Sequence, residues 1–217
     1  MMSTQHQEVI KMEMDGRVHV SNWPQGSMVD RLRFGRSGGL VVAQGHGMYQ
    51  EAVAQGNVYS AMSQTGCIWT VGLATIYTGV CLSNPNGSGK KLSVLAAGFS
   101  ERVAPAGIQD VSLAGAFSAT DVTHSVAGTP VNLQIGTGSI GVAKFDTGAT
   151  LPVAPKYLLP LIAGKTSAAL STASGIALVH IGGLVELKPG GFVIIACFTV
   201  GAAVGQMGCI LYQEINE

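Results

Sequence analysis

Two long stretches of this chain contain no charged side chain. Residues 52–89 and residues 192–213 include no Lys, Arg, Asp or Glu. Over the whole chain the charged fraction is 11%, whereas soluble domains average about 25%. A monomer of 217 residues with a formal net charge of +0 lacks the charged surface that keeps isolated domains dispersed in water. The composition therefore predicts that other protein subunits cover much of the surface, as in a component of an assembly.

The charged residues are concentrated in the first part of the chain. The first 60 residues hold ten of them and the remaining 157 hold fourteen. This change predicts an N-terminal arm with one short helix over residues 1–60 and a β-domain over residues 61–217. The helix is expected at residues 48–55, with Gly56 as its C-terminal stop.

The arm contains a short basic stretch at residues 30–36, DRLRFGR. It reads either as a solvated loop or as a segment that lies across an acidic neighbouring subunit. The arm has five basic and five acidic residues in all, so nucleic-acid binding is not expected.

After the arm the sequence has a β pattern. Glycine numbers 30, and short apolar runs rich in Val, Ile and Thr are separated by turn residues. This spacing favours a mainly β fold, a jelly-roll-like antiparallel β-sandwich, over alternating β and α units. Residues 156–174 break the pattern and predict a short helix or a long loop. Strands are expected at residues 68–73, 78–83, 91–100, 107–120, 131–134, 140–145, 175–180, 184–187, 191–200 and 209–215.

Neither a membrane helix nor a secretory leader is expected. Residues 192–211 are long enough to span a bilayer, but they read as two β-type runs joined by a glycine-rich stretch without flanking basic residues. The first residues lack the apolar core of a signal peptide. The four cysteines form no CxxC pair and are expected to be small buried residues in a protein made in a reducing cytoplasm.

Two motifs suggest chemistry. The triplet Asp146-Thr147-Gly148 is how retroviral-type aspartic proteases present one carboxylate, and a single copy would require a homodimer. Pro152 and Pro155 do not suit that family, and the triplet is also good turn chemistry, which we prefer. Residues 84–91, NPNGSGKK, superficially resemble a phosphate-binding loop, but Asn84 and Lys91 replace its first glycine and final Ser/Thr, so a strand-to-strand corner is expected.

No enzymatic activity is expected from the remaining residues. The five histidines are scattered, no pair has the spacing of a zinc site, and no GxSxG elbow is present. His180 is expected to be a hydrogen-bonded histidine at the edge of the core. The sequence therefore assigns no catalytic residue, no metal ligand and no cofactor site.

Residues 48–91 resemble virion structural proteins of tailed bacteriophages. In that group a helical Y-x-E-A-x-x-x-G segment leads into Thr- and Ala-rich strands and then into an N-P-x-G-S-G-K corner. The similarity continues weakly to the closing PGG, strand, glycine loop and strand pattern, over about two thirds of the chain. The matching positions are structural ones: Tyr49, Gly56, Asn84, Pro85, Gly87 and Gly89.

The resemblance implies a β-sandwich subunit of a phage particle, made in the bacterial host cytoplasm. Its expected function is that of a capsid cement or decoration protein, forming a homo-oligomer, with a trimer preferred to a dimer. The N-terminal arm would contact the major capsid protein or other virion proteins. The alternatives are a tail- or connector-associated adaptor and, more remotely, a homodimeric aspartic protease.

Overall fold

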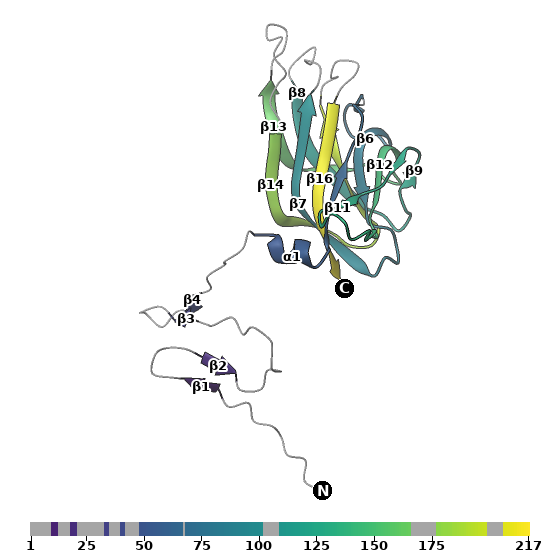
Figure 1. The fold of residues 1–217 in the computed structure, drawn as a ribbon. Coiled ribbons are helices and arrows are strands. Elements are labelled where there is room, and N and C mark those ends of the chain that lie inside the picture. The colour runs from purple at the N-terminus through teal and green to yellow at the C-terminus, as the bar shows by residue number, and fades with distance from the viewer. Residues whose placement is uncertain are drawn as a thin grey trace. The chain divides into compact units, whose positions relative to one another are not determined.

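The computed structural model describes residues 48–66, 68–101, 109–165, 177–198 and 206–217, with four short strands before residue 48. In that first part, β1 (Ile10–Met12) pairs antiparallel with β2 (Val18–Val20), and β3 (Arg33–Phe34) pairs with β4 (Leu40–Val41). The chain divides into two compact units, Met1–Met48 and Tyr49–Glu217 (Figure 1). The basic stretch at residues 30–36 of the N-terminal arm lies largely outside the described residues. The short helix and all the strands discussed below belong to the second unit.

The described residues of the second unit form two antiparallel sheets and one short helix, α1 (Gln50–Ala54) (Figure 1). The five-stranded sheet has the order β11-β5-β16-β7-β14, and the seven-stranded sheet has the order β10-β12-β6-β15-β8-β13, with β9 also paired to β12. The strands of the first sheet are β5 (Val58–Met62), β7 (Lys90–Glu101), β11 (Val131–Asn132), β14 (Ala177–Leu187) and β16 (Gln206–Asn216). Those of the second are β6 (Ile76–Ser83), β8 (Gln109–Phe117), β9 (Thr123–His124), β10 (Ala127–Gly128), β12 (Lys144–Thr150), β13 (Lys156–Lys165) and β15 (Gly191–Cys197).

The pairing of the long strands is that of a jelly roll. Strands β5 to β8 pair with β16, β15, β14 and β13 in reverse order, as in one long antiparallel ribbon folded back on itself. The ribbon then rolls up, because β15 also pairs with β8 and β16 also pairs with β7. Along β5–β8, and again along β13–β16, consecutive strands alternate between the sheets. The predicted mainly β, jelly-roll-like antiparallel sandwich with one short helix is confirmed.

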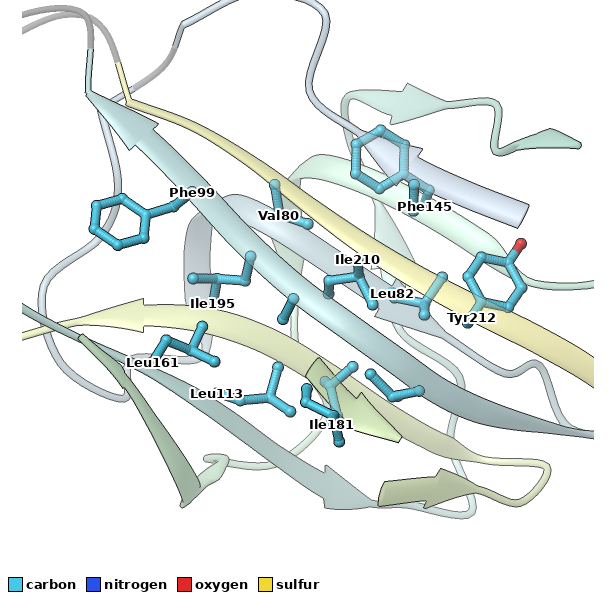
Figure 2. Packing of buried hydrophobic residues seen from close by; sticks show 14 of the residues in the cluster. Val80, Leu82, Phe99, Leu113, Phe145, Leu161, Ile181, Ile195, Ile210 and Tyr212 are labelled. Carbon is cyan, nitrogen blue, oxygen red and sulfur yellow. The ribbon is translucent and has the colours of Figure 1, made fainter. Parts of the chain in front are cut away.

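The main core lies between the two sheets. Alternate residues of each strand point inward, among them Leu82, Leu113, Ile195, Ile210 and Tyr212, all of which are fully buried (Figure 2). Each large side chain buried in this way contributes about 1.5–3 kcal/mol relative to exposure. The core therefore accounts for the alternating apolar residues of β6, β8 and β16.

A second, smaller core covers the outer face of the seven-stranded sheet. Tyr77, Cys81, Phe192 and Ile194 point to this face and are buried with Val122 of the segment that follows β8. Strand β15 is therefore buried on both faces along its whole length. A strand covered on both sides reads as a continuous apolar run, which explains why residues 191–197 contain no charge.

Several predicted elements are confirmed with shifted limits. Helix α1 lies within residues 48–55, and Gly56 ends it with a φ of +72°. The two strands expected at residues 175–180 and 184–187 form one strand, β14, with an irregular register between His180 and Val185. The two β runs predicted within residues 192–211 correspond to β15 and β16, which lie in different sheets. None of the described helices is long and apolar enough to cross a membrane.

Two of the predicted secondary-structure elements are wrong, and one strand was not predicted. Residues 68–73 form no strand. They make an irregular segment in which Trp69 is buried and a single isolated bridge joins Val71 to Cys197. Residues 156–165 form edge strand β13, although a short helix or a long loop was expected over residues 156–174; residues 166–174 lie outside the described residues. Strand β5, which the pattern did not indicate, completes the sheet beside β16.

The corner at residues 84–89 carries the chain from one sheet to the other. Buried Asn84 donates from Nδ2 to the carbonyl oxygens of Lys90 and Leu187, at 2.7 and 3.0 Å. Its backbone N–H donates to the Gly191 carbonyl at 2.9 Å. The predicted strand-to-strand corner is confirmed, and the strand β7 follows where a phosphate loop would require a helix.

Candidate functional site

Three polar side chains from distant parts of the chain meet on the outer face of the seven-stranded sheet. In the register of β6 and β12, Ser83 lies opposite Lys144, and Cys81 lies opposite Asp146. Residues directly opposite one another share a face, and so do residues two apart on a strand. Ser83 and Asp146 therefore project to the same side. His124 reaches them from β9, which pairs with the far end of β12.

The three side chains form a continuous polar chain. The Oγ of Ser83 is 3.1 Å from Nε2 of His124. On the other side of the ring, Nδ1 lies 3.4 Å from Oδ2 of Asp146, and neither of these two atoms has a hydrogen bond of its own. The imidazole is thus held between a hydroxyl and a carboxylate.

The carboxylate of Asp146 is fixed by the local backbone. Its Oδ1 accepts hydrogen bonds from the N–H groups of Gly148, at 2.7 Å, and Val126, at 3.0 Å. The register of β12 against β6 shifts between Asp146 and Gly148, so the triplet forms a bulge inside a strand. The bulge leaves Oδ2 to face His124.

The sequence suggested that the Asp146-Thr147-Gly148 triplet is either a turn or the carboxylate of an aspartic protease, and its location in the structure fits neither interpretation. The triplet is not a turn between strands, because β12 runs through it from Lys144 to Thr150. The Asp146 side chain is also fully buried within its own chain. An aspartic protease dyad needs two carboxylates that face each other across a dimer axis, and the burial of Asp146 gives that alternative no support.

The surroundings favour a neutral imidazole. Burial lowers the pKa of His124 below its ordinary value, and the charge of Lys144 acts in the same direction, while the nearby carboxylates of Asp146 and Asp121 oppose them. Burial, with a further contribution from the charge of Asp146, raises the pKa of the Cys81 thiol far above its usual range. The histidine is therefore a potential proton acceptor at neutral pH, whereas the neighbouring thiol is inert.

A cavity of about 390 Å³ opens beside this chain of side chains. Its polar lining includes Ser83, His124, Lys144 and Asp121, and its other walls are apolar or backbone. The covering segment is tied down by Asp121, whose Oδ1 accepts hydrogen bonds from the backbone and side-chain nitrogens of Asn86 at 2.8 and 2.7 Å. The remaining lining residues are Pro85, Val122, Ala127, Gly128 and Phe145.

The arrangement has the components of nucleophilic catalysis. A hydroxyl within hydrogen-bond reach of an imidazole, which a carboxylate orients from the other side, is recognised by geometry and not by sequence order. Sequence reasoning missed this cluster because no local motif connects Ser83, His124 and Asp146. Only the pairing of β12 with both β6 and β9 brings them together.

The other residues singled out in the sequence have structural roles. Tyr49 precedes α1, and Gly87 and Gly89 have φ values of +78° and +66° in the β6–β7 corner. His180 is exposed on β14 and is not part of the core edge that was expected. The described residues contain no group of three or more side chains suited to holding a metal ion.

Part of the outer face of the five-stranded sheet is a second notable surface, which we term the apolar face. Met62, Val131 and Leu178 are exposed there by 40%, 48% and 46%. Cys209 and Leu211 of β16 lie between them and are half-buried. The register places on this face Ser60, Met62, Ala96, Gly98, Ser100, Val131, Leu178, His180, Met207, Cys209, Leu211 and Gln213.

No Lys, Arg, Asp or Glu lies among these twelve residues, although the same register also places Lys91 and Glu186 on the outer face, at the β6–β7 corner end. The first ion pair next to it joins Lys91 and Glu186 at 3.3 Å. A shallow cavity of about 170 Å³ lies on the face, lined in part by Met62, Leu178 and Cys209. A separate apolar cavity of about 510 Å³ lies at Phe117, Leu158 and Leu184, and it holds no comparable cluster of polar side chains.

No protein-family model matches the chain, and no curated protein matches it significantly. The resemblance to phage virion proteins therefore rests on the sequence motif at residues 48–91 alone. The observations that bear on function are the polar cluster with its cavity beside Ser83 and the apolar face.

Proposed function

We propose that the chain is a virion structural protein of a tailed phage, a cement or decoration subunit that stabilises the head. This role is mechanical, since it consists of binding the capsid lattice and other copies of the same chain. The observation that carries the proposal is the apolar face of the five-stranded sheet.

The apolar face fits a contact with other subunits. Isolated exposed apolar side chains are common on soluble proteins, but a contiguous patch without charges marks an interaction surface. Here the patch extends over β11, β5, β16, β7 and β14, and includes the exposed side chains of Met62, Val131 and Leu178. Subunit interfaces are depleted of charged residues at their centre in the same way.

A second copy of the chain is the occupant we propose for the apolar face. Ser60 and Ser100 have small side chains and Gly98 has none, so no bulky side chain stands at these positions in the middle of the sheet. Another sheet could therefore approach closely. A closed trimer is preferred to a dimer, because three sandwiches around a threefold axis cover the most apolar surface and also shelter the open sheet edges. The sandwich would thus reach its final stability only in the oligomer.

The N-terminal arm is proposed to bind the major capsid protein or another virion protein. An extended segment binds by adding backbone hydrogen bonds or by filling grooves, and its ordering cost is met on assembly. The basic stretch at residues 30–36 would favour an acidic partner surface. Nucleic acid and membrane are not proposed as partners.

A tail- or connector-associated adaptor is the second candidate. An adaptor that recognises another molecule should expose aromatic side chains. Phe117 is 66% exposed, and the rings of Tyr157 and Phe198 stack at 4.3 Å while both remain partly exposed. These aromatic residues support the adaptor, whereas the apolar face supports either structural role.

Three measurements test the proposal. The purified chain should sediment as an oligomer, with a trimer expected, and a monomer at micromolar concentration would contradict the role assigned to the apolar face. A chain lacking residues 1–45 should remain a folded oligomer but should no longer bind mature phage heads. Head binding by this truncated chain would count against the arm, and the position of the protein in electron-microscopy density of an intact particle would separate head from tail.

A further inference from the structure

We propose that Ser83 is an activated nucleophile and that the cavity beside it is an acyl-transfer site for small carboxylic esters. His124 would act as the general base and Asp146 as the residue that positions it. This inference is independent of the proposed role in a virion, because it concerns the opposite sheet and requires no partner.

The distances fit these roles. A general base has to lie within about 2.6–3.2 Å of the group it deprotonates, and Nε2 of His124 is 3.1 Å from Oγ of Ser83. The contact of 3.4 Å between Nδ1 and Asp146 Oδ2 is longer, but such contacts are often loose without substrate and tighten when it binds. Both facing atoms are buried without another hydrogen bond, so each has a position free for the other.

The two oxygens of Asp146 differ in their contacts, and the difference supports a role for Oδ2 in positioning His124. Oδ1 alone stabilises the bulge, through the N–H groups of Gly148 and Val126. Oδ2 makes no such hydrogen bond, and a buried oxygen without a hydrogen-bond partner destabilises the folded state unless another interaction offsets its lost hydration. Holding the Nδ1–H tautomer of His124 supplies that compensation, and this tautomer leaves Nε2 with the lone pair that accepts the Ser83 proton.

The cavity selects the class of substrate. Its volume of about 390 Å³ is within the range of small-ligand pockets. The walls formed by Val122, Ala127 and Phe145 suit a short hydrocarbon acyl chain. Lys144, directly opposite Ser83 in the sheet, also lines the cavity, and it is the cation proposed to stabilise the negative charge that develops on the carbonyl oxygen.

The reaction would proceed in two balanced steps. Oγ of Ser83 forms a bond to the ester carbonyl carbon, its proton passes to Nε2 of His124, and the bond to the alkoxide breaks as that proton is given to the departing alcohol. Water then attacks the acyl-serine, again through His124, which releases the carboxylic acid and restores Ser83. The sum is hydrolysis of one ester by one water.

Phosphonylation by a fluorophosphonate tests the nucleophile directly on the full-length chain. The reagent forms a bond from phosphorus to Oγ, releases fluoride and leaves the serine proton on His124. Intact mass after incubation at pH 8 should show one added phosphonyl group, and peptide mapping should locate it on Ser83. The absence of an adduct on Ser83 would overturn the proposal.

Matched variants separate activation from mere exposure. Ser83→Ala should abolish the adduct, whereas Ser112→Ala should react like the unmodified chain, since Ser112 is a comparably buried strand serine that does not line the cavity. His124→Gln should slow the reaction about 100-fold or more. Equal labelling rates for His124→Gln and the unmodified chain would show that His124 does not act as a base for Ser83, and this would overturn the proposal.

The pH profile of the unmodified chain provides a test that needs no substitution. The labelling rate should fall as the pH decreases through the lowered pKa of His124, because only the neutral imidazole accepts a proton. A rate that stays flat down to the lowest pH at which the chain remains folded would contradict general-base activation. With 4-nitrophenyl acetate, a burst of one nitrophenolate per chain that is missing in Ser83→Ala is expected, and no burst would argue against an acyl-serine.

Discussion

The ammonium Nζ of Lys90 lies 2.8 Å from Oε2 of Glu214, whose side chain is fully buried. The other carboxylate oxygen, Oε1, accepts hydrogen bonds from the N–H groups of Val142 and Ala143 at 2.6 and 3.3 Å. Glu214 thus connects β16, the start of β7 and the segment that leads into β12. It is a fixed charge at the end of the sandwich near the β6–β7 corner.

Replacing Glu214 should destabilise the sandwich. Glu214→Ala removes the partner of Lys90 and leaves two backbone donors without an acceptor, so the free energy of unfolding should decrease by roughly 2–4 kcal/mol. Glu214→Gln retains one acceptor for the backbone and should cost less. Urea denaturation measures both, and equal stability of Glu214→Ala and the unmodified chain would contradict the role of this contact.

The corner between β14 and β15 requires glycine at position 190. Gly190 has a φ of +85°, and a Cβ there would meet the Ser118 carbonyl oxygen and lie 2.7 Å from Oδ1 of Asn86. Gly190→Ala should therefore lower the free energy of unfolding by about 3 kcal/mol or more, because backbone strain and steric overlap act together.

Gly87 provides the matched control for this substitution. It has a similar φ of +78°, but nothing lies within 4 Å of the position its Cβ would occupy. Gly87→Ala should cost only the left-handed strain, roughly 1–2 kcal/mol. Thermal unfolding of the two variants distinguishes the two contributions, and equal losses would mean that steric overlap at Gly190 is unimportant.

Stability should depend on pH through His124. Its pKa in the folded chain is lowered, first by burial, from the ordinary value of 6.5. The folded state therefore binds fewer protons than the unfolded state just below pH 6.5, so the free energy of unfolding should be constant above that pH and decrease below it. Denaturation between pH 7.5 and pH 5.5 measures this slope.

His124→Gln is the control for the pH dependence. The substitution keeps a polar side chain beside Ser83 but removes the titrating group, so the slope between pH 7.5 and pH 5.5 should become smaller. An unchanged slope would assign the pH dependence to other groups. This measurement concerns stability alone and does not depend on any reactivity of Ser83.

The elements that the sequence predicted well are those whose burial leaves a strong pattern. Strand β15 is buried on both faces, and its uninterrupted apolar residues predict a strand directly. Strand β13 was missed because Pro160 argues against a strand, yet β13 is the edge of its sheet, where the missing N–H of proline is tolerated. Residues 68–73 have strand-like composition, but Trp69 fills the core from an irregular segment.

The candidate site was not predictable for a different reason. Ser83 and His124 are 41 residues apart in sequence, and their contact depends on which strands lie beside β12. Periodicity identifies strands but does not specify their partners or register. Asp146 was noticed through its triplet, although for a chemistry that needs an exposed carboxylate, and only the bulge in β12 reveals that it faces a histidine.

The apolar face leads to the last prediction, which concerns assembly. Met62→Lys and Leu178→Lys place a charge at exposed positions of this face, so the fold should be retained. Burying an unpaired charge in a subunit interface is costly, and each substitution should raise the dissociation constant of the oligomer at least about tenfold, or ~1.4 kcal/mol. Ile76→Lys is the matched control, because Ile76 is 76% exposed on β6 of the other sheet. Analytical ultracentrifugation should show dissociation for the first two variants and none for the third, and equal behaviour of all three would place the subunit contact elsewhere.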